Sequence, residues 1–95
     1  MSMRVGTLRV YFRIQGSNSL KEKRMVLRSI KDRLASRFNV SVAEIGSNEK
    51  WQLGELGIAL VGNETRFVNS CVEKVKHFLT LDHRISIIEA AVEII

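Results

Sequence analysis

The chain has 95 residues, 45% of them hydrophobic and 26% charged, which is enough for one domain with a modest core and too little for two. Fifteen basic and ten acidic residues give a net charge of +5, so a polyanion is the first class of partner to consider. A single cysteine excludes an internal disulfide framework.

The sequence has no apolar run of membrane-span length, and its N-terminal segment lacks an apolar stretch of signal-peptide length. The lone Cys71 agrees with a reducing compartment. We therefore expect one domain covering residues 1–95, located in the cytoplasm and without a membrane segment.

The first element in the chain is an alternating segment from Val5 to Ile14. Apolar side chains on one side alternate with a mixed set on the other, namely Thr7, Arg9, Tyr11 and Arg13. This period of two predicts a half-buried strand. Residues 15–18 then predict a turn.

The next segment, Ser17–Phe38, concentrates the positive charge. It holds seven basic and two acidic residues, so its net charge of +5 equals that of the whole chain. Ser19, followed three residues later by Glu22, forms a capping box that predicts a helix from Leu20. The apolar face of this helix consists of Leu20, Val26, Leu27, Ile30, Leu34 and Phe38. A row of cations adjoins that face: Lys21, Arg24, Arg28 and Lys31.

The first turn of this helix breaks a local rule. Lys21, Lys23 and Arg24 crowd the end of the helix dipole at which acidic residues are favoured. Such departures are frequent at functional sites, and cations beside free backbone N–H groups favour an anion such as phosphate. Lys and Arg are also good helix formers that commonly fill a solvated face, so both interpretations stay open.

Three more elements of the sheet and a second helix follow. Residues 40–45 and 56–62 predict strands, the second of them an inner strand, and a polar loop at 46–50 joins them through Trp51 and Gln52. Asn39 suits the end of the first helix, and Asn63 suits the start of the second. The last segment, 84–95, predicts a strand that is apolar on both sides. The apolar face of the second helix consists of Phe67, Val68, Cys71, Val72, Val75, Phe78 and Leu79.

The order β-α-β-β-α-β is the split βαβ arrangement called ferredoxin-like. We therefore predict an α+β sandwich with a ferredoxin-like βαββαβ fold, in which two helices cover one face of a four-stranded antiparallel sheet. The other face is left free and includes Ala59 and Val61 beside the mixed set of the first strand. An open, partly apolar face of this kind is a candidate oligomer interface.

Three motifs stand out along the chain: Ser19-Leu20-Lys21-Glu22-Lys23-Arg24 after a strand ending in Ile14-Gln15-Gly16, Phe38-Asn39-Val40-Ser41-Val42-Ala43-Glu44, and Trp51-Gln52. With these motifs the chain resembles the YlxP-like family of small bacterial proteins over essentially its whole length. The resemblance implies a ferredoxin-like fold and a cytoplasmic bacterial protein with no established reaction. Genes of this family often lie beside those for translation initiation and ribosome-maturation factors, which implies a role near the ribosome. The functional patch that the resemblance implies consists of Ser19, Lys21, Lys23 and Arg24.

The leading prediction is a non-enzymatic protein that binds ribosomal or other structured RNA through its basic helix. Contacts to phosphates would supply affinity and position but little sequence readout. A secondary surface could stack a base, although the third strand lacks the aromatics of an RNA-recognition motif. The candidate phosphate-binding residues are Ser19, Lys21, Lys23, Arg24, Arg28 and Lys31, and the secondary surface consists of Arg9, Tyr11, Arg13 and Trp51.

Two alternatives come from other classes of protein. One is a homodimeric structural or adaptor protein that uses the open sheet face. The other is a phosphate-transfer enzyme, because residues 14–16 and 61–63 superficially resemble acylphosphatase; Lys21 stands where that enzyme has Arg, and the exchange is not conservative at a bidentate phosphate site. We expect no cofactor and no metal, because one cysteine and two histidines do not provide ligand spacing.

Overall fold

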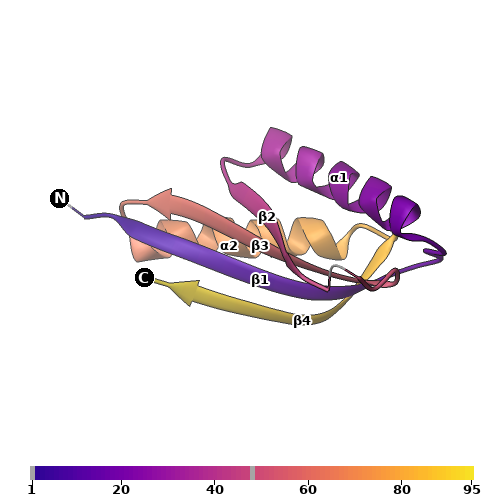
Figure 1. Cartoon of the computed structure of the whole chain (residues 1–95). Coiled ribbons are helices and arrows are strands. Elements are labelled where there is room, and N and C mark those ends of the chain that lie inside the picture. Colours follow the sequence, from indigo (N-terminus) through magenta and orange to yellow (C-terminus); the bar gives the residue numbers. More distant parts are fainter. Residues whose placement is uncertain (1, 48) are drawn as a thin grey trace.

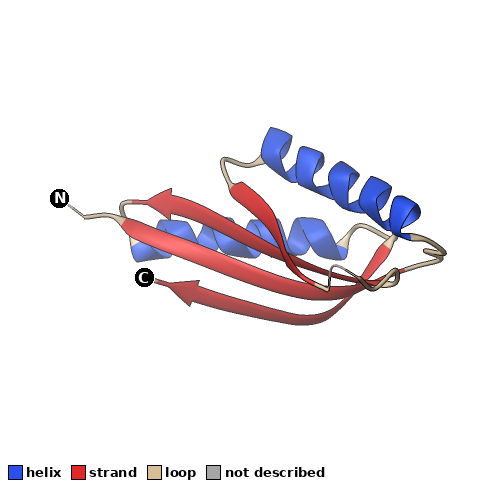
Figure 2. Cartoon of the chain, in the orientation of Figure 1, coloured by secondary structure: helices blue, strands red, loops and turns tan. Residues whose placement is uncertain are grey.

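The computed structural model describes residues 2–47 and 49–95 of the chain. Its elements are β1 (Arg4–Ile14), α1 (Leu20–Arg37), β2 (Ser41–Gly46), β3 (Leu53–Gly62), α2 (Thr65–Thr80) and β4 (Ile85–Ile94). The strands form one antiparallel sheet in the order β2-β3-β1-β4, with the helices packed on the sheet (Figure 1; Figure 2). The predicted ferredoxin-like α+β fold is confirmed. None of the helices in the described residues is both long and apolar enough to cross a bilayer.

The core lies between the sheet and the two helices. Every second side chain of β1 from Leu8 to Ile14 is at most 1% exposed, as the alternation of the sequence predicts. Burial of each such side chain stabilises the fold by about 1.5–3 kcal/mol. The helices contribute Leu27, Ile30 and Leu34 from α1, and Val68, Val72, Val75 and Leu79 from α2.

Glycine at position 54 allows the helix layer to approach the sheet closely. A Cβ atom there would lie 2.6 Å from a ring carbon of Phe12 and 3.4 Å from a methyl carbon of Leu27. A side chain on this face of β3 would therefore push against the layer that carries α1.

The prediction that the last strand is apolar on both sides is wrong, because β4 contains a bulge. Tyr11 pairs with Glu89 but Phe12 pairs with Ile87, so Ile88 is the extra residue. The bulge reverses the alternation at this point. Ile85 and Ile87 before it, and Ala90, Val92 and Ile94 after it, therefore all lie on the helix-facing side, and the open face receives Ser86, Glu89, Ala91 and Glu93.

The ends of three elements also differ from the sequence prediction. Phe38, not Asn39, follows α1 in extended conformation. Glu64, not Asn63, is the residue before α2, because the chain bends over two residues between β3 and the helix. β3 begins at Leu53, three residues earlier than its apolar run, because its first residues pair with β1 up to Arg13.

Candidate nucleic-acid interface

Helix α1 begins where the sequence places its cap. The Ser19 hydroxyl accepts a hydrogen bond from the Glu22 backbone N–H at 3.1 Å, and the Glu22 carboxylate accepts one from the Asn18 N–H. The first bond satisfies a backbone donor that the first turn would otherwise leave open, and the second ties the residue before the cap to that turn. Ser19 is thus explained by capping, and the start of the helix is fixed.

Three cations lie exposed along one flank of α1: Lys21, Arg24 and Arg28, called the basic stripe below. In the described part of the chain, none of the three has a carboxylate partner within 4 Å. Spacings of three and four residues place them on one side of the helix, in a row of about 10 Å at about 1.5 Å per residue. The stripe therefore offers three cations that form no ion pair within 4 Å, with the exposed Asp32 one helical turn beyond Arg28.

Lys23 does not belong to this stripe. Its side chain is only 4% exposed, and its ammonium donates hydrogen bonds to the backbone carbonyls of Ser47 and, at 2.7 Å, of Lys50. Burial lowers the pKa of Lys23, and the nearby Glu44 carboxylate opposes that shift. The expectation that Lys23 is free to bind phosphate is corrected, because its ammonium is committed to the connection between β2 and β3.

A signal for this burial is present in the sequence. Position 23 lies four residues before Leu27 and seven before Ile30, which places it in the core-facing row of the helix. A long lysine side chain can pass over apolar surface and still bring its ammonium to polar atoms. Here those atoms are backbone carbonyls of a neighbouring connection instead of water.

The remaining cations of α1 are engaged within the fold. Lys31 lies 3.9 Å from the Glu44 carboxylate of β2 and is half-buried, so it supplies less free charge than predicted. The guanidinium groups of Arg33 and Arg37 lie 5.1 and 5.4 Å from the ring centre of Phe78, on the side of α1 that faces α2. These contacts separate them from the basic stripe.

A second polar cluster fixes α1 to the connection between α2 and β4. Arg84 donates two side-chain hydrogen bonds to Asp82, at 3.0 and 2.7 Å, and one at 3.0 Å to the Ser29 hydroxyl of α1. Arg33 lies 3.5 Å from the same carboxylate. The hydrogen bonds from Arg84 hold the pKa of Asp82 below its usual range, and the same pair raises the pKa of Arg84. α1 is thus attached on both flanks.

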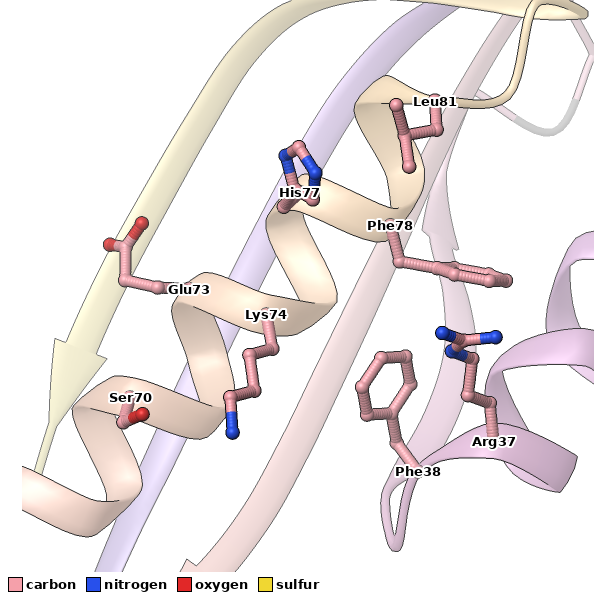
Figure 3. Close-up of a pocket in the computed structure, with 8 residues that line it drawn as sticks. All are labelled: Arg37, Phe38, Ser70, Glu73, Lys74, His77, Phe78 and Leu81. Carbon is pink, nitrogen blue, oxygen red and sulfur yellow. The ribbon is translucent and has the colours of Figure 1, made fainter.

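A hollow of about 440 Å³ lies between the end of α1 and the outer side of α2. Figure 3 shows Arg37 and Phe38 on one side of it and the side chains of α2 on the other, with the Arg37 guanidinium beneath the ring of Phe78. Phe38 and Phe78 meet edge to face at 5.6 Å. These aromatic contacts explain why Arg33 and Arg37 turn toward α2 and away from the basic stripe.

The open sheet face provides a poor platform for RNA at its centre. Tyr11 stands directly between Glu55 on β3 and Glu89 on β4, and Arg9 lies 3.5 Å from the Glu55 carboxylate. Carboxylates on both sides of an aromatic ring repel a phosphate backbone. Within the predicted secondary surface, the charge of Arg9 is therefore offset by Glu55, and Tyr11 has a glutamate on each side. Both residues lie on the open sheet face, apart from the α1 stripe.

Trp51 and Arg13 lie together at one end of the sheet. They line a hollow of about 440 Å³ with residues 49, 50, 52 and 53, and Trp51 is 52% exposed. Lys23 attaches this region to the first turns of α1. The structure thus places Trp51 and Arg13 around one hollow, whereas Arg9 and Tyr11 line a neighbouring one with Ser47, Glu55 and Glu89.

The two segments that resemble acylphosphatase lie at opposite ends of the sheet. The β1–β3 register pairs Gly62 with Arg4, ten residues before Ile14, a separation of about 33 Å along the strand. Residues 14–16 and 61–63 therefore cannot line a common site. That the protein is not an enzyme stays a prediction. Within residues 2–47 and 49–95 no group of three or more His, Cys, Asp or Glu side chains is placed to hold a metal ion.

Comparisons with known proteins agree with the resemblance seen in the sequence. Residues 5–92 match the family described as Protein of unknown function (DUF503). The protein named Uncharacterized protein YlxP from Bacillus subtilis (strain 168) is 39% identical over 66 residues, which cover 70% of this chain and 72% of that protein. A solved structure, De novo designed protein Foldit4, has a TM-score of 0.57 at 14% identity and is similar in fold over 99% of this chain and 97% of its own.

Proposed function

The chain belongs to the DUF503 family of proteins of unknown function, and we propose that it is a non-enzymatic cytoplasmic protein that binds structured RNA, most specifically ribosomal RNA, through the basic stripe of α1. The single observation that carries the proposal is the row of exposed cations, Lys21, Arg24 and Arg28, none of which has a described carboxylate within 4 Å. A row of this kind attracts a polyanion.

The attachments of α1 support the proposal because they make the row rigid. Lys23 joins one flank of the helix to the β2–β3 connection, and Arg84 joins the other flank to the α2–β4 connection. Cations on a fixed helix lose less conformational freedom on binding than the same cations on a mobile segment. The local charge is therefore available for binding without prior ordering of the backbone.

The chemistry of the stripe favours recognition of backbone shape over base sequence. Lys and Arg contacts to phosphates set affinity and register, and they carry no direct sequence information. With three such contacts, a fourfold rise in salt concentration should weaken binding about 20- to 40-fold. Steep salt dependence is thus the signature that the proposal requires.

The test is co-sedimentation of the purified protein with ribosomal subunits at low and high salt. A variant with Lys21→Glu, Arg24→Glu and Arg28→Glu removes the stripe and changes the net charge from +5 by six units to −1. A matched control, Arg4→Glu with Arg66→Glu and Lys74→Glu, makes the same charge change at exposed positions outside the stripe.

The proposal requires that the native protein and the control both sediment with a subunit at low salt, and that the stripe variant stays in the supernatant. Equal loss of binding in both variants would mean that only net charge matters. Absence of the native protein from every pellet would refute ribosomal binding and direct attention to other polyanions.

A second candidate function is a homodimer formed through the open sheet face. The observation that favours it is a shallow hollow of about 370 Å³ on that face, where Ile45 lies over Gly57 beside Ala43 and Ala59. Ile45 and Val61 are 47% and 59% exposed there. Sedimentation velocity over a range of protein concentrations tests it, with loss of the dimer on Ala59→Glu as the expected result.

A further inference from the structure

Trp51 is one of two aromatic side chains of the described residues that are more than half exposed, the other being Phe67 on α2. It is the only tryptophan of the chain and leaves 52% of its surface in water, while the neighbouring Leu53 is partly covered by the sheet. Exposed aliphatic residues are common on proteins, but a half-exposed indole presents a large flat face that is available for stacking. The question is what holds it there.

Hydrogen bonds from two elements, α1 and β1, hold the connection that carries Trp51. The buried Lys23 ammonium donates to the carbonyls of Ser47 and Lys50, and the Lys50 N–H donates to the Ser47 carbonyl at 3.2 Å. On the other side of Trp51, the Gln52 carbonyl accepts from the Ile14 N–H at 2.8 Å. Both immediate neighbours of Trp51 in the chain are therefore attached, one to α1 and one to β1.

The backbone conformation of Ser47 indicates that neighbouring contacts hold this part of the connection in place. Its φ of +59° lies in the left-handed region, which non-glycine residues rarely adopt. Such a conformation persists where neighbouring contacts determine it. The Lys23 ammonium, which binds the Ser47 carbonyl, is such a contact, so a lysine of the basic helix orders the connection that presents the indole.

The surroundings of the indole suit a nucleotide. The hollow of about 440 Å³ beside Trp51 is lined by Arg13 and Lys50 as well as Glu49, which leaves a surplus of one positive charge. A base can stack on the indole while its phosphate faces Arg13 or Lys50. Lys23 lies in the same turn of α1 as Lys21 and Arg24, so one turn carries two cations of the stripe and the side chain that holds the connection beside the hollow.

We propose that Trp51 stacks an unpaired base of an RNA whose backbone lies on the basic stripe, and that Lys23 is the positioning residue that holds Trp51 in place. The inference rests on the proposed function, since the stripe brings the RNA to the hollow. It narrows the ligand to RNA with an unpaired nucleotide next to a folded part. The centre of the open sheet face, with Tyr11 between two glutamates, takes no part.

The indole reports directly on its own contact, because no other tryptophan is present. The native protein is titrated with a single-stranded RNA of about ten nucleotides, within the length that a small domain covers. Parallel titrations use a fully paired RNA, polyglutamate and adenosine monophosphate. Binding is followed by the fluorescence anisotropy of a label on the RNA, and Trp51 emission is recorded separately.

Single-stranded RNA should quench Trp51, whereas paired RNA and polyglutamate should bind in a salt-dependent manner and leave its emission unchanged. Trp51→Ala should weaken single-stranded binding about tenfold and paired binding hardly at all, and Trp51→Phe should retain most of the affinity. Lys23→Met should lower affinity for single strands without changing the salt slope, because Lys23 contacts no phosphate, and should make Trp51 more accessible to acrylamide in the free protein.

Other outcomes separate the inference from the function on which it rests. Salt-dependent binding of single-stranded RNA with unchanged Trp51 emission and no effect of Trp51→Ala would overturn the inference and leave the stripe standing. Quenching by adenosine monophosphate as strong as by RNA would overturn it in favour of a free-nucleotide site. Quenching by polyglutamate would identify a protein-binding surface, and absence of binding to every RNA would refute both proposals.

Discussion

Replacement of Lys23 by methionine tests the role that the structure gives to this side chain. Methionine keeps an unbranched apolar stem of similar length in the core-facing row of α1 and removes the ammonium. The carbonyls of Ser47 and Lys50 then lose the donor that they share. Because Lys23 is only 4% exposed, water cannot replace the ammonium without a shift of the connection.

The expected loss follows from two opposing contributions. Two hydrogen bonds from a charged donor are together worth about 3–6 kcal/mol, at about 1.5–3 kcal/mol each. Burial of the ammonium opposes this gain, as the lowered pKa of Lys23 indicates, and methionine has no charge to bury. We therefore expect the free energy of unfolding to fall by about 2 kcal/mol, which lowers the Tm by about 10 °C for a domain of this size.

Thermal and urea unfolding followed by circular dichroism measure this change. Lys21→Met removes the same charge from an exposed position two residues away and serves as the control, with an expected change within about 0.5 kcal/mol. If Lys23→Met and Lys21→Met unfold at the same temperature as the native protein, the ammonium does not stabilise the connection, and the positioning role fails.

The pH dependence of the same pair gives an independent check. Since the pKa of Lys23 is lower in the folded state, the unfolded chain binds more protons as the pH rises through that pKa toward the ordinary value of 10.5. Within this window, the free energy of unfolding of the native protein should therefore rise with pH relative to that of Lys23→Met. A constant difference across the window would show that burial does not perturb the ammonium.

Three further substitutions test other parts of the fold by urea unfolding. Asp82→Asn should lower the free energy of unfolding by about 2 kcal/mol at neutral pH, because Arg84 loses its charged partner. The Asp82 side chain is only 7% exposed, so water replaces it poorly. The pKa of Asp82 is lowered by folding, so this difference should be complete above the ordinary value of 3.8 and should vanish as the pH falls through the folded pKa; persistence at lower pH would contradict the pairing. Gly54→Ala should cost about 2 kcal/mol because its Cβ would lie 2.6 Å from the Phe12 ring, and a neutral effect would show that this contact can relax. Ser19→Ala should cost about 1 kcal/mol through loss of the helix cap, and Ser19→Asp should restore it.

The fold could be predicted from the sequence because the pattern of each segment and the order of the segments along the chain point to the same architecture. Alternation in β1, the capping box at Ser19 and the two amphipathic helices each predict the element found there. The bulge at Ile88 was not accessible, because every residue around it from Ile85 to Ile88 apart from Ser86 is apolar, and an apolar run does not show which way a side chain points.

The candidate site was only partly predictable, and the reason lies in long-range contacts. Composition identifies α1 as the basic segment, but it does not separate free cations from engaged ones. Lys23 finds its partners 24 and 27 residues away, and Arg33 and Lys31 meet carboxylates on other elements. The sequence also does not show that Trp51 lines a hollow with Arg13 while Tyr11 lines a neighbouring one with two glutamates.

The salt dependence of RNA binding tests the central claim most directly. For native protein and a structured ribosomal RNA fragment, the logarithm of the association constant should fall with the logarithm of salt concentration at a slope of about −2 to −3, as three phosphate contacts require. Lys21→Glu with Arg24→Glu and Arg28→Glu should bring the slope close to zero, and the matched control at Arg4, Arg66 and Lys74 should keep it. A native slope near zero, or equal slopes for both variants, would contradict the assignment of RNA binding to the basic stripe.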